Sequence, residues 1–320
     1  MLHQYSGRRL KTNHPVILIG LAGDHLELSS AIFLGDDVHQ SAPFAQRLCL
    51  GFHAHDNIFR LAQAFKAVTI AAKSILGYYA DLNRYPPPAG STAHMFPNPT
   101  RLDGDPLLEN LRFKCRLSRA GTRVTLPKLE DDRRLGLYIA SMPAPPSSAA
   151  ASDIEVVVKF TARYNVKAHR LLAEAGLAPR LYSCSRVLGE LYMVVMEFLP
   201  GKTMLHSCRG CKYLPWSVYA DIEAAIQRLH AEGIVFGDLR LSNIMCFEPK
   251  ATSESVFGPE QGPMRAKLID FDWAGVADVE RYPAMLDDSL RDWAPGVERY
   301  GVMRAEHDLA MLEKLRWVCG

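Results

Sequence analysis

The sequence predicts an α+β protein in which a small β-rich lobe precedes a reduced helical lobe, with a small α/β region in front of both. Residues 111–198 contain several strand-like apolar runs and one helical stretch. A second helix is predicted at 216–233, after the chain-breaking pair Pro200-Gly201. A polar run that includes Asp238 follows this helix, so the residues best suited to catalysis fall in the second lobe.

Composition limits the classes of protein that the chain can belong to. With 320 residues, 48% of them hydrophobic, it can form two domains or one bilobal domain. Its 37 Lys and Arg balance 35 Asp and Glu, so we expect neither a nucleic-acid nor a membrane partner. Seven cysteines, an odd number without regular spacing, favour reduced thiols. We therefore expect an intracellular protein, cytoplasmic or nuclear.

Residues 1–84 form the predicted N-terminal region. Two apolar runs at 16–19 and 25–33, separated by a turn, predict a hairpin. From Asp56 onward apolar residues recur at helical spacing, which predicts one long helix with Asp56 as N-cap and Gly77 as its end.

The rest of the chain is divided by a proline-rich stretch. Prolines and glycines crowd residues 85–106, which we interpret as a linker. Residues 107–320 then form the bilobal domain, with a small lobe at 107–199 and a large lobe at 200–320. The elements predicted in it are strands at 111–117, 135–141, 154–160, 179–182 and 191–198 and helices after Asn165, at 216–233 and at 305–315.

Three polar residues behind the helix at 216–233 have the spacing of a phosphoryl-transfer site. Asp238 is followed five residues later by Asn243, and Asp270 ends the next apolar strand. Such a set can orient a hydroxyl and hold magnesium on ATP phosphates. Structural roles, a turn cap for Asp238 and a strand end for Asp270, are the alternative, but the order helix, strand, strand, aspartate favours the chemical one.

Lys159 is the fourth candidate. Alternation along the strand at 154–160 places it on one face with Val157. A lysine on a half-buried strand needs a charge partner, which ATP phosphates and a carboxylate would supply. The alternative is an edge lysine that extends its ammonium into water.

Residues Glu155 to Leu315 resemble the protein-kinase-like superfamily. The resemblance rests on Phe236-Gly-Asp-Leu-Arg-Leu-Ser-Asn243 and Leu268-Ile-Asp-Phe-Asp-Trp273. It is strongest toward compact members, namely the Bud32-like, aminoglycoside-phosphotransferase and choline-kinase branches, and toward kinase-like domains of filamentous fungi, some of them attached to crinkler-type effectors. The resemblance implies a bilobal fold and ATP and Mg²⁺ as cofactors.

The resemblance also implies a role for each candidate. Asp238 would be the catalytic base, Asn243 and Asp270 the metal ligands, and Lys159 the phosphate contact. The lobe connection at Met196, Glu197 and Phe198 would bind the adenine edge, mainly through its backbone. The following helix offers only Glu174 as the carboxylate partner of Lys159, and it lies near the helix end. Either Glu174 reaches Lys159 or this ion pair is missing.

The sequence departs from the family pattern at several points. No G-x-G-x-x-G joins the first two strands of the small lobe, where Gly121 and Gly136 stand alone. Gly237 replaces the arginine of regulated protein kinases, and D-F-D replaces D-F-G at Asp270. Only fifty residues follow Asp270, which leaves little room for a peptide-docking platform.

We therefore expect an ATP- and Mg²⁺-dependent phosphotransferase that acts on a hydroxyl, with a protein Ser or Thr acceptor favoured. A small-molecule kinase is the alternative that Gly237 and the short large lobe support. A third alternative is an ATP-binding pseudokinase or effector scaffold that works through residues 1–110. Retention of Asp238, Asn243 and Asp270 speaks against that third reading.

Overall fold

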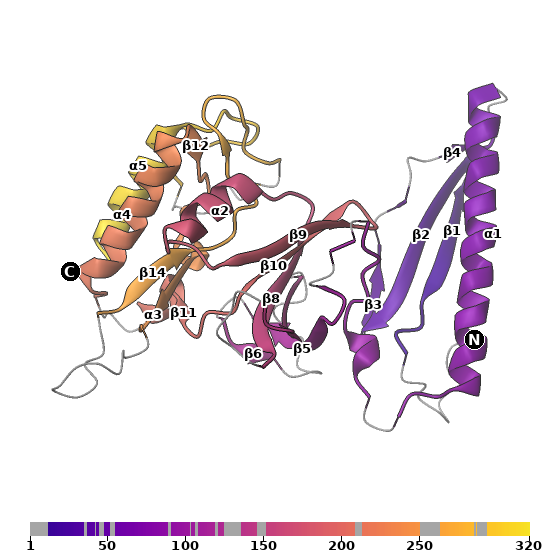
Figure 1. The fold of residues 1–320 in the computed structure, drawn as a ribbon. Helices are drawn as coiled ribbons and strands as arrows, with labels where there is room; N and C mark the ends of the chain where they lie inside the picture. Colours follow the sequence, from indigo (N-terminus) through magenta and orange to yellow (C-terminus); the bar gives the residue numbers. More distant parts are fainter. Residues whose placement is uncertain are drawn as a thin grey trace. The chain divides into compact units, whose positions relative to one another are not determined.

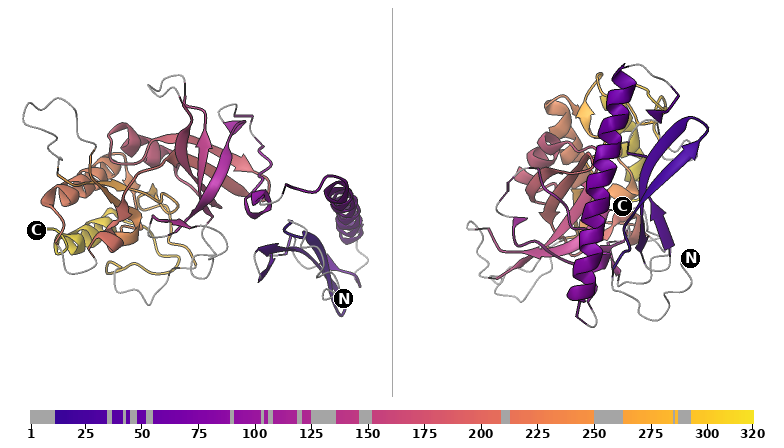
Figure 2. Two further views of the ribbon diagram at one scale, coloured as in Figure 1. Left: turned by 90° about the horizontal axis from the view of Figure 1, so that it is seen from below. Right: turned by 90° about the vertical axis from the view of Figure 1, so that its right-hand side faces the viewer.

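The computed structural model describes residues 12–34, 37–41, 43–44, 48–51, 55–88, 91–102, 104–105, 108–118, 121–124, 136–145, 152–208, 213–249, 263–284, 286 and 293–320. The chain divides into two compact units, Met1–Asn98 and Pro99–Gly320 (Figures 1 and 2). The division lies inside the predicted linker 85–106. Among the described residues, no helix combines the length and the apolar character needed to cross a bilayer.

The first unit is an antiparallel sheet with one long helix beside it (Figure 1). Its elements are β1 (Val16–Ala22), β2 (His25–Leu34), β3 (Asp37–Gln40), β4 (Leu48–Cys49), α1 (His55–Arg84) and the short 3-10 helix η1 (Ala93–Met95). Strand β2 is central because β1, β3 and β4 all pair with it. The β1–β2 hairpin is the predicted one, and Gly23 supplies the positive φ of its turn.

Helix α1 does not end at Gly77, so this part of the prediction is wrong. It runs for 30 residues to Arg84. A glycine inside a helix costs only about 1 kcal/mol relative to alanine, which a helix of this length tolerates. Part of the predicted apolar stripe stays exposed within the unit, including Ile58, Phe65 and Ile70.

The small lobe of the second unit is a six-stranded antiparallel sheet with one helix. Its elements are β5 (Arg112–Leu117), β6 (Arg123–Val124), β7 (Leu137–Met142), β8 (Ile154–Thr161), α2 (Val166–Glu174), β9 (Leu181–Val187) and β10 (Leu191–Glu197). The strand order is β6-β5-β7-β8-β10-β9. Helix α2 begins where the sequence predicts it, because the Asn165 carboxamide oxygen accepts from Ala168 N at 2.9 Å.

The two faces of this sheet pack into different hydrophobic clusters. Val156 and Val158 of β8 are buried in the core of one face. Val157 lies on the other face, together with Val194 and Met196, and Lys159 follows it in register. The predicted alternation of β8 is therefore confirmed, and it directs Lys159 away from the lobe's main core.

The large lobe has few helices and strands among the described residues, and they enclose a buried apolar core. Its elements are β11 (Lys202–Thr203), α3 (Met204–Ser207), α4 (Trp216–Ala231), β12 (Ile234–Val235), the 3-10 helix η3 (Leu241–Asn243), β13 (Ile244–Phe247), β14 (Arg265–Leu268), β15 (Gly275–Val276) and α5 (Ala305–Arg316). Helices α4 and α5 lie side by side under β12 (Figure 1). Their core includes Ala168 and Leu172 of α2, so α2 joins the two lobes.

One buried carboxylate fixes the strand that leads to Asp270. Asp221 of α4 accepts hydrogen bonds from Arg265 Nε at 2.8 Å and from Ala266 N at 2.9 Å. Both donors lie on β14, of which they are the first two residues. The predicted α+β architecture is confirmed, and its pieces converge on one cavity.

Candidate active site

A cavity of about 760 Å³ lies between the two lobes of the second unit. Its apolar lining comes from both lobes and includes Leu117, Leu137, Val157, Met196, Phe198, Leu199, Met245 and Ile269. Its polar lining includes Lys159, Asn243, Asp270 and Asp272. A concave site with one apolar end and a few convergent charged groups has the character of a nucleotide or small-ligand site.

The lobe connection predicted from the sequence lines the apolar end. Met196, Glu197 and Phe198 all border the cavity. The Glu197 carboxylate is already engaged, since it accepts from Arg180 N at 3.0 Å and from Lys267 Nζ at 3.2 Å. The Glu197 side chain is thus structural in this arrangement, and the backbone of the connection and its apolar side chains are left to meet a ligand.

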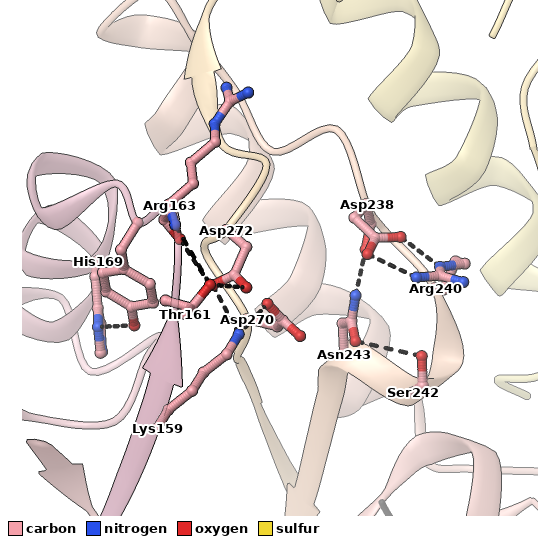
Figure 3. A network of polar contacts seen from close by, with 11 residues as sticks. Lys159, Thr161, Arg163, His169, Asp238, Arg240, Ser242, Asn243, Asp270 and Asp272 are labelled. Carbon is pink, nitrogen blue, oxygen red and sulfur yellow. Dashed lines mark hydrogen bonds and ion pairs between the residues drawn. The ribbon is translucent and has the colours of Figure 1, made fainter. Parts of the chain in front are cut away.

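Lys159 is the centre of the charged end (Figure 3). Its ammonium lies 2.6 Å from Asp270 Oδ1 and 2.7 Å from Asp272 Oδ1. Burial disfavours the charge, but the two carboxylates outweigh it and raise the pKa of Lys159. Burial and the charge of Asp270 raise the pKa of Asp272 to about 6.

Asp270 itself has a backbone conformation that only specific contacts can maintain. Its φ is 70°, in the left-handed region that non-glycine residues rarely adopt. Such conformations cost about 1 kcal/mol or more and gather at functional sites. Burial works against ionisation of Asp270, yet the Lys159 ammonium prevails and lowers the pKa of this carboxyl.

The structure does not bring Glu174 to Lys159. Glu174 is the last residue of α2 and is exposed, while both ion pairs of Lys159 run to the D-F-D segment. The expected contact fails because the inward face of α2 is occupied by His169 and its apolar neighbours. Of the two alternatives for this pair, the structure supports the one in which the helix carboxylate is missing.

His169 instead fixes α2 without a charge. Its Nε2 donates to Pro179 O at 2.8 Å, and Tyr164 Oη donates to its Nδ1 at 2.6 Å. Its ring stacks on Phe271 with 4.6 Å between the centroids. Burial lowers the pKa of His169 to about 4, so the ring is neutral near pH 7.

Asp238 and Asn243 lie on the other side of the charged end (Figure 3). Asp238 is buried and forms a two-pronged ion pair with Arg240, whose Nη2 lies 2.7 Å from Oδ2. Asn243 Nδ2 donates to the Asp238 carbonyl oxygen at 3.0 Å, which leaves its Oδ1 directed toward Ser242. Burial raises the pKa of Asp238, and Arg240 opposes this rise.

Two tryptophans form a wall beside this pair. The rings of Trp273 and Trp293 stack with 5.6 Å between their centroids. The Arg240 guanidinium lies 4.8 Å from the Trp293 centroid and 5.9 Å from that of Trp273. The Arg240 guanidinium therefore makes cation–π contacts with both tryptophans next to Asp238.

The loop that carries Asp238 is anchored from below by α5. Asp308 is fully buried and accepts from Phe236 N at 2.7 Å, Gly237 N at 2.9 Å and His230 Nε2 at 3.0 Å. Gly237 has a φ of 77°, and a Cβ there would lie 2.0 Å from Met303 Cε. A larger residue at this position, arginine included, would have a strained backbone conformation and would require the Met303 side chain to shift.

The expected gap in the phosphate lid can be followed only in part. Residues 125–135 lie outside the described residues. Before them, β6 folds back on β5, and a Cβ on Gly121 would lie 3.3 Å from Gly201 O. Gly136 approaches β8 closely, since its carbonyl oxygen accepts from Phe160 N. The described ends of this connection thus contact the lobe connection and β8.

Sequence reasoning missed several residues of this site. The sequence marks Asp272 only as a departure from the D-F-G pattern, and no pattern assigned a role to Asp308 or His169. The available signal was a polar side chain inside an apolar helical face, as for His169 in α2 and Asp308 in α5. That signal marks a buried polar contact but does not name its partner.

Comparison with known proteins gives distant relatives. No family model matches the chain. A Streptomyces coelicolor protein called a probable SapB synthase is 31% identical over 135 residues. The match spans 37% of this chain but only 14% of that protein, so the chain corresponds to a small part of it.

Solved structures give weak likenesses. The Cydia pomonella granulovirus kinase PK-1 is 12% identical, with 66% of this chain and 69% of that chain covered and a TM-score of 0.43. The Rad53 kinase domain is 18% identical, with 43% and 48% covered and a TM-score of 0.28. Scores this low carry no weight for function. In the second unit, the order of strands, α2, lobe connection, α4 and the D-F-D segment is the order that the resemblance to the protein-kinase-like superfamily implies.

Proposed function

We propose that this protein-kinase-like chain is an ATP- and Mg²⁺-dependent phosphotransferase that acts on a hydroxyl group. The observation that carries the proposal is the convergence of Lys159, Asn243 and Asp270 on one cavity, with Asp238 beside them. Lys159 and Asp270 are separated by 111 residues in the chain. Residues suited to phosphoryl transfer that lie on separate segments of the chain thus meet at the polar end of an apolar slot.

The cavity suits a nucleoside triphosphate. The apolar side chains beside Met196 and Met245 provide faces for a purine ring, and the backbone after Glu197 can pair with its edge. Lys159 at the opposite end would contact the phosphates. The cavity volume of about 760 Å³ exceeds what a purine ring alone needs.

The donor set fits a magnesium ion. Asn243 and Asp270 present an amide oxygen and a carboxylate, the hard oxygen ligands that Mg²⁺ prefers. Asp270 keeps 39% of its side-chain surface accessible. Two carboxylates face one ammonium here, so the charged end has an excess of negative charge that a cation would compensate. When bound, the metal neutralises charge on the phosphates during transfer.

Asp238 is the proposed base. It would hold the acceptor hydroxyl and take its proton as the hydroxyl oxygen bonds to the γ-phosphorus. The bond from that phosphorus to the bridging oxygen breaks, and ADP leaves with the electron pair. Arg240 contacts both Asp238 oxygens, so under this proposal it must release at least one of them.

The acceptor class divides two forms of the proposal. We favour a protein Ser or Thr side chain, as the fungal kinase-like resemblance implies. A small-molecule hydroxyl is the alternative, and the Trp273–Trp293 wall beside Asp238 favours it because a flat aromatic surface suits a compact acceptor. An ATP-binding pseudokinase would bind nucleotide without transfer.

One assay separates these forms. Purified protein is incubated with Mg²⁺ and ATP labelled at the γ-phosphate, with and without a generic protein substrate, and Asp238→Asn is the matched control. Label on protein that disappears in the control supports a protein kinase. Turnover stimulated by a panel of small alcohols without labelled protein supports the alternative. Binding of MgATP without turnover would contradict the transferase proposal.

A further inference from the structure

The carboxylate partner of Lys159 comes from an unexpected element. Both carboxylates near its ammonium belong to the D-F-D segment, at 2.6 Å for Asp270 and 2.7 Å for Asp272. The lysine side chain is only 13% exposed, so its charge depends on these contacts. Helix α2 contributes no carboxylate, since its one acidic residue, Glu174, is exposed at the helix end.

The two aspartates are held differently. Asp270 keeps 39% of its side-chain surface open, whereas Asp272 keeps 23%. Asp272 Oδ2 also accepts from Thr161 Oγ1 at 2.7 Å. Thr161 stands two residues after Lys159 on β8, hence on the same face of that strand. Asp272 is thus fixed to β8 at two neighbouring positions, and Asp270 at one (Figure 3).

The burial of Asp272 Oδ1 requires a compensating positive charge, which the Lys159 ammonium supplies. This atom has no hydrogen bond among the described residues, and the Lys159 charge 2.7 Å away is what compensates its burial. If Asp270 turns toward a metal, Lys159 keeps one carboxylate only because Asp272 remains. The geometry therefore separates a metal-binding carboxylate from a lysine-binding one.

Helix α2 is secured by other means. His169 binds Tyr164 Oη and Pro179 O, and its ring stacks on Phe271, between the two aspartates in the sequence. The D-F-D segment therefore contacts α2 through an aromatic ring and contacts Lys159 through carboxylates. No charge links α2 to Lys159 in the described residues.

We infer that Asp272, rather than a residue of helix α2, is the positioning residue that holds Lys159 against the nucleotide phosphates. The inference rests on the proposed function and deepens it. Orientation of the lysine is then built into the same three-residue segment that would hold the metal. A displacement of α2 would leave the lysine contact intact.

A double-mutant cycle on MgATP affinity tests this. The variants are Asp272→Asn, Lys159→Met and their combination, each measured by calorimetry with the full chain. Asp272→Asn keeps an oxygen for Thr161, and we expect it to weaken MgATP binding about tenfold to a hundredfold, as for loss of a charged hydrogen bond. In the Lys159→Met background the same change should have less than about a threefold effect, because Asp272 acts through the lysine.

Glu174→Gln is the matched control and should leave affinity unchanged in both backgrounds. If Asp272→Asn folds poorly by thermal unfolding, Thr161→Val replaces it, since it removes one anchor of Asp272 and leaves both charges. An equal loss in both backgrounds would overturn the inference and make Asp272 a metal or folding residue. A loss in Glu174→Gln that vanishes with Lys159→Met would also overturn it. Wild-type protein that binds no MgATP would instead contradict the proposed function.

Discussion

The charged end of the cavity has two halves, and the aspartates in them form different ion pairs. In the half that we propose binds the nucleotide phosphates, called the phosphate half, Lys159 is shared between Asp270 and Asp272. In the half that we propose binds the acceptor, called the acceptor half, Arg240 matches the single carboxylate of Asp238 with two contacts. One cation against two carboxylates leaves a formal charge of −1, whereas one against one leaves none. The phosphate half therefore carries one negative charge that no cation matches. In the acceptor half, the proposed mechanism requires Arg240 to leave at least one oxygen of Asp238.

The residues that fix the two halves in place also differ in charge. The segment next to the phosphate half is fixed by a neutral histidine, His169, with a tyrosine and a phenylalanine around it. The acceptor half is fixed by a buried carboxylate, Asp308, that accepts from two backbone N–H groups. Each half should thus respond to different perturbations.

Removing the carboxylate of the acceptor half should have the largest effect. Asp238→Asn should lower the rate of phosphoryl transfer about a thousandfold, as expected for loss of a general base. MgATP affinity should hardly change, because Asp238 faces the acceptor. Initial rates and calorimetry on the same preparation measure both. Asp278→Asn, which changes an exposed carboxylate, is the control, and equal rates in the two variants would remove Asp238 from its role.

Removing a carboxylate of the phosphate half should act on binding. Asp270→Asn should weaken ATP binding about a hundredfold in the presence of Mg²⁺, since a contact to a charged group contributes up to roughly 3 kcal/mol. Binding of ATP without Mg²⁺ should change little. Calorimetry with and without the metal separates the two effects. Unchanged stabilisation of the variant by MgATP in thermal unfolding would show that Asp270 is not a metal ligand.

Acid should loosen the α2 anchor. The folded-state pKa of His169 is about 4, below its unfolded value of about 6.5. Between these values the unfolded chain binds a proton that the folded chain excludes, so stability falls as pH falls. The expected loss between pH 7 and pH 5 is about 2 kcal/mol.

Denaturant unfolding of wild-type protein and His169→Gln across this range tests the anchor. Other carboxyl groups titrate in both proteins, so the informative quantity is the difference between their free energies of unfolding. The advantage of wild type should shrink toward pH 5. A difference that stays constant would mean that His169 does not titrate in this way.

The loop of the acceptor half should be sensitive to a single methyl group. Gly237→Ala places a Cβ at positive φ and against Met303 Cε, so we expect a loss of about 1–3 kcal/mol in stability. Transfer should slow as well, because Asp238 follows directly. Gly233→Ala is the matched control, since its φ of 67° carries the same backbone cost but its Cβ would meet no atom within 4 Å. Equal losses in both variants would show that the Met303 contact is unimportant.

The smallest expected effect is none at all. With glycine at 237, the position that precedes Asp238 has no side chain that could pair with a phosphate on a regulatory loop. Phosphatase treatment of active protein should therefore leave the initial rate unchanged. A large loss that returns only on rephosphorylation within residues 272–300 would contradict this.

Much of the fold follows from local sequence patterns. The strand of Lys159, the start of α2 at Asn165 and the helix α4 lie where periodicity and capping predict them. These features depend on neighbours in the chain, which a sequence displays directly. The end of α1 was mispredicted because one glycine is a weak signal against the propensity of a long helix.

Several residues that line the cavity could be named from the sequence, but their contacts could not. Lys159, Asn243 and Asp270 could be named from spacing, and they line one cavity. The partner of Lys159 could not be named, because the distance between β8 and the D-F-D segment is set by packing of the two lobes. The same holds for Asp308, because the backbone N–H groups that donate to it lie more than seventy residues earlier in the chain.

A crystal structure with Mg²⁺ and a non-hydrolysable ATP analogue would test the central claim most directly. The account predicts the purine beside Met196 and Met245, a metal on Asn243 and Asp270, and phosphate oxygens within hydrogen-bond distance of Lys159 while Asp272 stays in contact with that lysine. It also predicts that Arg240 has left at least one oxygen of Asp238. Nucleotide bound elsewhere, or a cavity left empty at saturating analogue, would contradict the account.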